Sequence, residues 1–256
     1  MRPVLFDLGG LQVQSYGVSK ALAALVAGWL LGREMRRRGY DPEPAMVLAI
    51  AATIGGFVGA KLYYLAEVSG RGITAHDLGG SGFTWYGGLI AGAATTILVA
   101  RRRGIPIGPL SGMAAIPLAV AYGIGRLGCL LAGDGTYGRP TSLPWGMRFP
   151  HGTVPTTQFV HPTPLYEALT AFAVALVLLR LRDRLAPTAL FGVFAVLMGL
   201  ARFLVEFVRL NDRVVLGLTT AQLFSLAMVA GGALLIRQAR PRAQTESAQR
   251  AVDVAA

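Results

Sequence analysis

Charged side chains, cysteine and histidine are scarce in this sequence. Only 14% of the 256 residues are charged, whereas soluble domains carry roughly 25%. The single cysteine excludes an intramolecular disulfide framework. With three histidines and 13 acidic residues, a zinc site is not expected, and we predict neither a metal nor another cofactor. Together with 54% hydrophobic residues, this shortage of charge indicates a protein of the lipid bilayer.

Two further features are missing. The sequence contains no internal repeat of the kind found in many secondary transporters, which argues against a transporter. A cleavable signal peptide is not expected, because only Arg2 precedes the first apolar run and no small-residue cleavage pattern follows it. We interpret residues 1–14 as a short extended or interfacial segment that precedes the first membrane helix.

The formal net charge of +11 could indicate a nucleic-acid-binding protein, but the positions of the basic residues favour another interpretation. Arginines gather just after every second apolar run. These basic clusters are Arg33 with Arg36–Arg38, Arg101–Arg103, Arg180 with Arg182 and Arg184, and Arg237 with Arg240 and Arg242. Clusters at alternate span ends are typical of the cytoplasmic side of a membrane protein, so nucleic acid is not expected as a partner.

The apolar runs predict an all-α polytopic membrane protein, because each is close to the ~20 residues that cross a bilayer. The seven expected spans are about 16–31, 45–67, 83–100, 108–133, 163–179, 189–207 and 218–236. The basic clusters place the N-terminus outside and the C-terminus in the cytoplasm. Outer segments are expected at 68–82 and 134–162, and glycines four residues apart, such as Gly55 with Gly59, predict closely packed helices.

We expect residues 1–236 to form one membrane domain. The tail, 237–256, is polar and rich in Ala and Arg, so it is expected to be a disordered cytoplasmic segment.

Charged side chains inside two of the spans indicate a functional site, because such residues are costly at membrane depth. Arg202 and Glu206 are four residues apart, so they share one helix face and can pair. Arg126 has no acidic residue three or four positions away, so its partner must lie on another helix, in a water-filled cavity or on a ligand. Guanidinium groups match the geometry of phosphate. The arginines therefore indicate either structural ion pairs or a site for an anionic lipid head group.

His161, Tyr166 and Glu167 lie where the second outer segment enters the fifth span. A histidine beside a carboxylate can act as a general base, and it can equally anchor the start of a helix. Both interpretations stay open.

Tyr16 and Tyr86 begin two spans, where aromatic belts place tyrosine in any case. Cys129 follows Arg126 by about one helical turn and is interpreted as a small buried residue.

Six motifs occur in a fixed order along nearly the whole chain. They are SYG at 15–17, YGGLIAG at 86–92, GRLG at 125–128, GDGTYGRPTSLPWGMRFP at 133–150, HPTPLYE at 161–167 and ARFLVEFVR at 201–209. The order and the sequences of these motifs resemble those of the prolipoprotein diacylglyceryl transferase family. Members of this family also have seven spans and an external N-terminus. The motif at 125–150 is long and specific.

The resemblance implies a monomeric transferase of the bacterial cytoplasmic (inner) membrane, with a periplasmic N-terminus. Phosphatidylglycerol would donate its diacylglyceryl group to the thiol of the lipobox cysteine in a preprolipoprotein signal peptide. A thioether would form and glycerol 1-phosphate would leave. The implied partners are therefore phosphatidylglycerol, the signal peptide and the surrounding membrane lipids.

By the same resemblance, Arg126 and Arg202 would bind or activate the phosphate-bearing lipid. Gly138 would shape the loop, Glu206 would support Arg202, and Tyr16 would line the site. The other residues assigned to the head group and the loop are Gly87, Gly88, Arg139, Tyr166 and Glu167.

The sequence departs from the family pattern at several positions. Tyr86 stands where members carry a histidine proposed as the catalytic base, Cys129 stands for an asparagine, and Met198 stands for a tyrosine. Asp134 matches the usual acidic residue in a loop that is one residue longer.

Tyr86, His161 and Asp134 are therefore all candidate bases, and a tyrosine needs a lowered pKa for that role. Alternatively, the arginines polarise the lipid enough for water, or the substrate's own environment, to take the proton. The competing hypothesis is a divergent paralogue that binds or moves phospholipid, or modifies another acceptor, without this activity.

Overall fold

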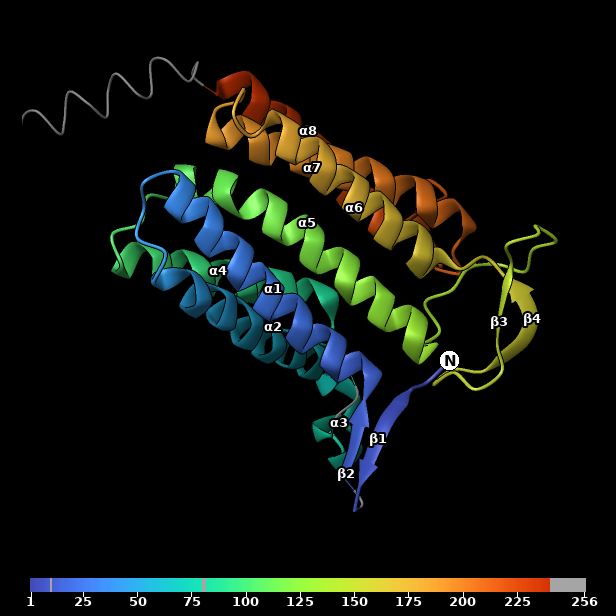
Figure 1. Ribbon diagram of the computed structural model, residues 1–256. Coiled ribbons are helices and arrows are strands. Elements are labelled where there is room, and N and C mark those ends of the chain that lie inside the picture. Colours follow the sequence, from blue (N-terminus) through green and yellow to red (C-terminus); the bar gives the residue numbers. More distant parts are fainter. Residues whose placement is uncertain (10, 80–81, 240–256) are drawn as a thin grey trace, which may run out of the picture. The chain divides into compact units, whose positions relative to one another are not determined.

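The computed structural model describes residues 1–9, 11–79 and 82–239, and most of them are helical (Figure 1). The long helices are α1 (Ser15–Arg37), α2 (Pro44–Val68), α4 (Trp85–Arg102), α5 (Ile107–Ala132), α6 (Thr163–Leu181), α7 (Pro187–Val205) and α8 (Thr220–Gln238). Three short helices, η1 (Ser69–Arg71), α3 (Ala75–Leu78) and η2 (Glu206–Val208), extend or follow them. The predicted disordered tail falls almost wholly on 240–256, outside the described residues.

Within the described residues, six helices are long and apolar enough to cross a membrane: α1, α2, α5, α6, α7 and α8. The third expected span forms α4, a helix of 18 residues that is not among these six. Glycines, threonines and the terminal Arg101 and Arg102 make α4 less apolar than its neighbours. The structure therefore supports a multi-pass membrane protein.

Local sequence signals account for the helix ends. Pro164 and Pro187 lie in the first turns of α6 and α7, where a missing N–H costs nothing. Thr219 and Gln222 form a capping box at the start of α8, in which the Thr219 hydroxyl accepts from the Gln222 N–H at 3.2 Å. These caps fix where the chain enters each helix.

The described chain divides into two compact units. One contains 1–26 and the residues from 111 onward, and the other contains Ala27–Leu110. In the second unit, α2 packs against α4 through glycines. A Cβ added to Gly59 would lie 2.6 Å from the carbonyl oxygen of Gly87, and one added to Gly92 would lie 3.1 Å from that of Ala52. The predicted close approach of helices at these glycines is confirmed.

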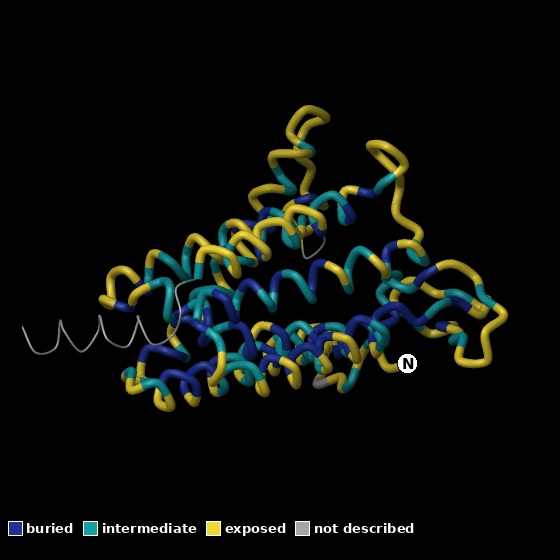
Figure 2. Tube along the Cα trace, turned by 90° about the horizontal axis from the view of Figure 1, so that it is seen from above, coloured by how far each residue is buried: buried dark blue, intermediate teal, exposed yellow. Residues whose placement is uncertain are grey.

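The first unit has its core between α5, α6 and α7. The core residues are Ala115, Ile116, Ala119, Ala171, Val174, Ala175, Leu178, Leu190 and Met198. Buried and half-buried positions follow much of α5 in Figure 2. Buried side chains of all three helices meet in this core, and the polar side chains Tyr122, Glu167 and Arg202 come from the same three helices.

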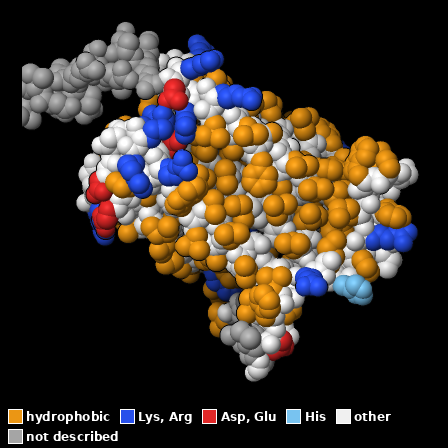
Figure 3. Space-filling view, viewed as in Figure 1, with side chains coloured by type: hydrophobic (Ala, Val, Ile, Leu, Met, Phe, Trp, Pro, Cys, Tyr) orange, Lys and Arg blue, Asp and Glu red, His pale blue; other side chains and the backbone are white. Residues whose placement is uncertain are grey.

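The outer faces of these helices are apolar. Leu169, Leu176 and Leu204 are 60%, 60% and 65% exposed. Figure 3 shows apolar side chains over the face of α5–α8, and Lys and Arg side chains gather at the end where α6 leads into α7. An exposed apolar face with charges at the helix ends is what a lipid-facing surface requires.

The all-α expectation is incomplete, because the described residues also form three antiparallel hairpins, one before α1 and two between later helices. They are β1 (Val4–Leu8) with β2 (Leu11–Gln14), β3 (Met147–Phe149) with β4 (Thr156–Val160), and β5 (Arg213–Val215) with β6 (Leu218–Thr219). The first agrees with the extended segment expected at 1–14. The second lies inside the long outer segment and pairs Met147 with Val160.

The outer segment 68–82 was expected to be a loop, and it contains η1 and α3 instead. Asp77 in α3 accepts hydrogen bonds from Arg71 at 2.6 Å, from the Thr74 hydroxyl at 2.6 Å and from the Tyr64 hydroxyl at 2.7 Å. These bonds, from Arg71 first and then Thr74, hold the pKa of Asp77 well below its usual range. A short capped helix therefore orders a segment whose composition is polar and glycine-rich.

Candidate functional site

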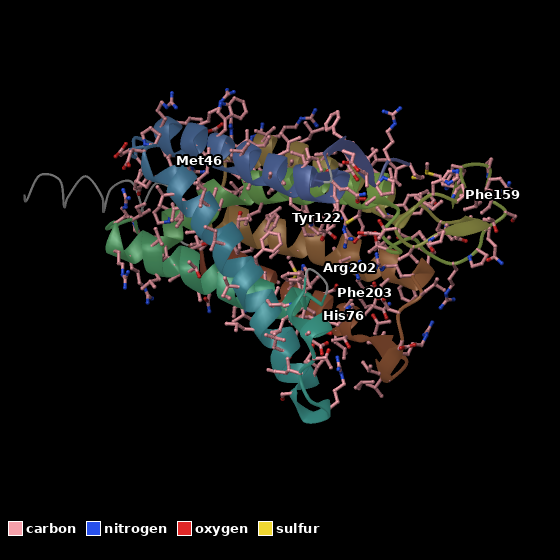
Figure 4. The ribbon with its side chains drawn as sticks, turned by 90° about the horizontal axis from the view of Figure 1, so that it is seen from below. Met46, His76, Tyr122, Phe159, Arg202 and Phe203 are labelled. Carbon is pink, nitrogen blue, oxygen red and sulfur yellow. The ribbon has the colours of Figure 1, made fainter. Side chains whose placement is uncertain are left out.

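Glu167 on α6 lies at the centre of a buried group of charges in the first unit. Its Oε1 atom is 3.1 Å from Nη2 of Arg126 on α5 and 2.8 Å from Nη1 of Arg202 on α7. Its Oε2 atom is 3.4 Å from Nη1 of Arg209, just after η2. The Tyr122 hydroxyl donates to Oε1 at 2.7 Å. Figure 4 labels Tyr122 and Arg202 on their two helices.

Glu206 is the second carboxylate of this group. Nη2 of Arg202 is 2.8 Å from its Oε2, which confirms the predicted pair four residues apart. Nε of Arg209 is 3.7 Å from the same oxygen. Oε1 of Glu206 accepts from Asn211 and, at 3.0 Å, from the hydroxyl of Thr219 at the start of α8. Glu206 thus joins the end of α7 to α8.

Arg126 finds its partner on another helix, one of the three predicted places. On its own helix, its Nε donates to the Tyr122 hydroxyl at 3.1 Å, and its guanidinium lies 5.2 Å from the centre of that ring. Its Nη1 is 4.0 Å from Sγ of Cys129, which is 5% exposed. Tyr122, Arg126 and Cys129 therefore follow one face of α5, and the burial of Cys129 agrees with its interpretation as a small buried residue.

We call Arg126, Arg202, Arg209, Glu167 and Glu206 the arginine cluster. Their side chains are between 0% and 22% exposed. Three guanidinium groups face two carboxylates, so the cluster carries a net charge of +1. Coulomb interactions are several times stronger at such buried positions than in water. A monoanion that reaches the cluster would neutralise it.

The loop at 133–150 is attached directly to this cluster. The carbonyl oxygen of Thr136 accepts from Nη1 of Arg209 at 3.0 Å and from the hydroxyl of Thr163 at 2.5 Å. The Gly138 N–H donates to the His161 carbonyl at 2.9 Å, and the Arg139 N–H donates to a carbonyl at the end of η2 at 2.8 Å. Backbone bonds therefore hold the loop against both α6 and η2.

Gly138 stands where the backbone leaves no space for a side chain. A Cβ there would meet the Val208 carbonyl oxygen, and it would lie 3.0 Å from both the Cβ of His161 and the Cγ2 of Thr163. A glycine is needed here for close approach rather than for its backbone angles. The neighbouring Arg139 side chain is exposed.

Two cavities border these residues. A small one of about 30 Å³ is large enough for a water-sized group. Its lining is Tyr122, Tyr166, Glu167, Thr170, Ala171, Met198, Ala201, Arg202 and Val205. A larger one of about 280 Å³ is lined by Gln14, Tyr16, Ala132, Asp134 and Thr153. Two predicted site residues, Tyr16 and Asp134, thus share one cavity.

His161 and Tyr166 are in contact at the start of α6. Nδ1 of His161 is 3.3 Å from the Tyr166 hydroxyl, which also accepts from Nε1 of Trp145 at 2.8 Å. Asp134 accepts from the Thr136 hydroxyl at 2.6 Å and from the Thr136 N–H at 3.1 Å. His161 is therefore held within the first unit by Tyr166 of α6, and Asp134 is held by Thr136 of its own loop.

Comparison with known proteins identifies the family. The sequence model described as "Prolipoprotein diacylglyceryl transferase" matches residues 3–237. A phosphatidylglycerol–prolipoprotein diacylglyceryl transferase of Clostridium tetani is 34% identical over 251 residues, which cover 95% of this chain and 100% of that protein. The chain belongs to the prolipoprotein diacylglyceryl transferase family.

Similarly named relatives come from distant bacteria. The protein of Methylococcus capsulatus is 34% identical over 94% of this chain and 96% of its own length. That of Synechococcus elongatus is 32% identical over 91% of this chain and 85% of its own length. The similarity to this family therefore extends over nearly the whole chain.

The family motif YGGLIAG opens α4 in the second unit. The Trp85 and Tyr86 rings meet edge to face with their centres 5.3 Å apart. Gly87 packs against α2, where an added Cβ would lie 2.5 Å from the Gly59 carbonyl oxygen, and Gly88 faces the carbonyl oxygen of Gly56. Both glycines therefore have a packing role within this unit.

Sequence reasoning missed Arg209, a member of the arginine cluster, and Tyr122, which hydrogen-bonds to Glu167 and Arg126. Arg209 lies three residues after Glu206, and Tyr122 lies four residues before Arg126, so helical spacing could have found both. Within the described parts of the chain, no group of three or more His, Cys, Asp or Glu side chains is placed to hold a metal ion.

Proposed function

We propose that this member of the prolipoprotein diacylglyceryl transferase family transfers the diacylglyceryl group of phosphatidylglycerol to the lipobox cysteine of prolipoproteins. The relatives named for this reaction match over 82–98% of the chain. The observation that carries the proposal is the buried arginine cluster, whose net charge of +1 complements one phosphodiester.

The reaction breaks the bond between the glyceryl carbon and the phosphate oxygen. The cysteine sulfur attacks that carbon and forms the thioether, while the bonding electron pair leaves with glycerol 1-phosphate. Guanidinium groups that already point at the phosphate stabilise the charge that develops on the leaving oxygen. Arg126 and Arg202 supply these groups, and Glu206 orients Arg202.

The acceptor thiol must lose its proton, because the thiolate is the nucleophile. The candidate acceptors of that proton are Tyr86, His161 and Asp134, with water or the substrate's own environment as the alternative. Tyr16 and Asp134 line the larger cavity, and Gly138, Arg139 and Tyr166 shape the loop beside the arginine cluster. Gly87 and Gly88 pack α4 against α2 within the second unit, and their assignment to the head group stays a prediction.

We further propose that α4 also crosses the membrane, which brings the number of spans to seven. In this arrangement the protein lies in the bacterial cytoplasmic membrane and its N-terminus is periplasmic. If α4 did not cross, Arg101–Arg103 and the basic cluster after α1 would lie on opposite sides of the bilayer. Seven crossings keep every basic cluster on one side. Reporter fusions after residues 40, 82, 104 and 162 test this arrangement, and a periplasmic signal from the fusion at 104 would contradict it.

The reaction is tested with purified protein, phosphatidylglycerol and a synthetic lipobox peptide, with mass spectrometry as the readout. The expected product is the peptide with a thioether-linked diacylglyceryl group, together with glycerol 1-phosphate. Arg126→Ala should lose turnover, whereas Arg180→Ala, an exposed arginine at the other end of α6, should retain it. Lipid binding without a thioether would favour the divergent paralogue instead.

A further inference from the structure

We propose that Glu167 is a positioning residue that sets the charge of the arginine cluster, so that it accepts a phosphodiester and releases a phosphomonoester. This inference rests on the proposed function, because that reaction converts a phosphodiester substrate into a phosphomonoester product. Phosphatidylglycerol carries one negative charge on its phosphate. Glycerol 1-phosphate carries between about 1.5 and 2 at neutral pH, since its second pKa is near 6.

The contacts of Glu167 single it out among the acidic residues that the structure describes. It reaches all three arginines, Arg126 at 3.1 Å, Arg202 at 2.8 Å and Arg209 at 3.4 Å. These arginines come from three different segments: α5, α7 and the residue after η2. One carboxylate therefore determines both how the three guanidinium groups converge and how much positive charge they retain.

Glu206 differs from Glu167 in its surroundings. It pairs with Arg202 and Arg209 but also accepts from Asn211 and Thr219. Its side chain is 0% exposed, and it lies outside the lining of the small cavity. Glu167, in contrast, lines that cavity together with Arg202 and Tyr122. Glu167 is thus the carboxylate of the cluster that borders open space, and a phosphate bound at Arg202 would widen this small cavity and lie beside Glu167.

The consequence is a matching of charges. With Glu167 ionised, the cluster carries +1, so a phosphodiester brings it to zero. Cleavage to a phosphomonoester leaves an excess of negative charge beside Glu167, and the product is repelled. Without the Glu167 charge the cluster would carry +2, which matches the doubly charged product. Glu167 therefore favours substrate over product at the same arginines.

The variant Glu167→Gln removes the charge while an amide oxygen can still accept from Arg202. Binding is measured by calorimetry on the purified full-length protein, with glycerol 1-phosphate and the soluble diester glycerophosphoglycerol as probes. We expect Glu167→Gln to bind the monoester at least about tenfold more tightly, with a smaller gain for the diester. Glu167→Asp keeps the charge and should keep the wild-type ratio of the two affinities.

Glu34→Gln is the matched control. Glu34 is also a buried carboxylate paired with an arginine, Arg37 at 3.1 Å. It belongs to the second unit and lies next to a cytoplasmic basic cluster, so its loss should leave both affinities unchanged. Equal monoester affinity in Glu167→Gln and wild type would overturn the inference. If the wild type forms the thioether in that case, the proposed function survives without it.

A second measurement needs no variant, so it stays decisive if Glu167→Gln does not fold. In the wild type, the ratio of monoester to diester affinity is followed from pH 7.5 to 5.5. The monoester becomes a monoanion over this range while the diester does not titrate, so a change in the protein that affects both probes alike cancels in the ratio. Charge matching predicts that the ratio rises as the pH falls. A ratio that falls would contradict it.

Discussion

Arg202→Lys tests whether the site needs the shape of a guanidinium or only its charge. Arg202 spans two carboxylates at once, with Nη1 2.8 Å from Glu167 and Nη2 2.8 Å from Glu206. A lysine ammonium is a single point and is unable to hold both oxygens in the same geometry. The variant therefore keeps the net charge of the cluster and loses one charge-assisted contact.

The expected cost follows from that lost contact. A hydrogen bond to a charged group contributes about 1.5–3 kcal/mol, and a loss of 2 kcal/mol in the transition state corresponds to a rate reduction of roughly 30-fold. We expect kcat to fall by about this factor or more, while the protein still folds and the phosphate is still attracted. The assay is formation of the lipidated peptide, with Arg180→Lys as the control. A rate within about twofold of wild type would refute the idea that the forked guanidinium is required.

The remaining predictions concern four other positions. Tyr86→Phe should lose most activity and Tyr86→His should retain it if this residue takes the thiol proton, and an active Tyr86→Phe enzyme would remove Tyr86 from the candidates. Gly138→Ala should lower the free energy of unfolding by about 1–3 kcal/mol, because the added methyl meets the backbone of η2; an unchanged thermal midpoint would contradict this. Cys129→Ala should have nearly normal turnover, and an inactive enzyme would contradict its interpretation as a packing residue. Asp77→Asn should be less stable than the wild type at pH 7. Since the pKa of Asp77 is lowered in the folded state, that difference should shrink as the pH falls below about 4, the usual pKa of aspartate. A difference that stays constant in thermal melts from pH 7 to 3 would exclude this cause.

The sequence could predict Arg126, Arg202 and Glu206 as site residues because charged side chains are rare within apolar runs. The spacing of Arg202 and Glu206 predicted their pair, since neighbours on one helix are fixed by helical geometry. The same reasoning showed that Arg126 needs a distant partner. It left Glu167 unidentified as that partner, because contacts between helices depend on packing that no local pattern encodes.

The second and third hairpins and the short helix α3 were missed for a related reason. Hydropathy and the distribution of arginines locate helices in a membrane, but they carry little information about the segments between them. The pairing of Met147 with Val160 joins residues that are far apart along a glycine- and proline-rich stretch. The bonds of Gly138 and Arg139 to His161 and η2 depend on the same tertiary arrangement.

The central claim is that the arginine cluster holds the phosphate of the lipid donor. It is tested most directly by an experimental structure of the purified protein with phosphatidylglycerol bound. We predict that the phosphate lies between Arg126 and Arg202, with its oxygens within hydrogen-bonding distance of both guanidinium groups. A lipid whose phosphate binds elsewhere, with Arg126 and Arg202 still closed on Glu167, would contradict it.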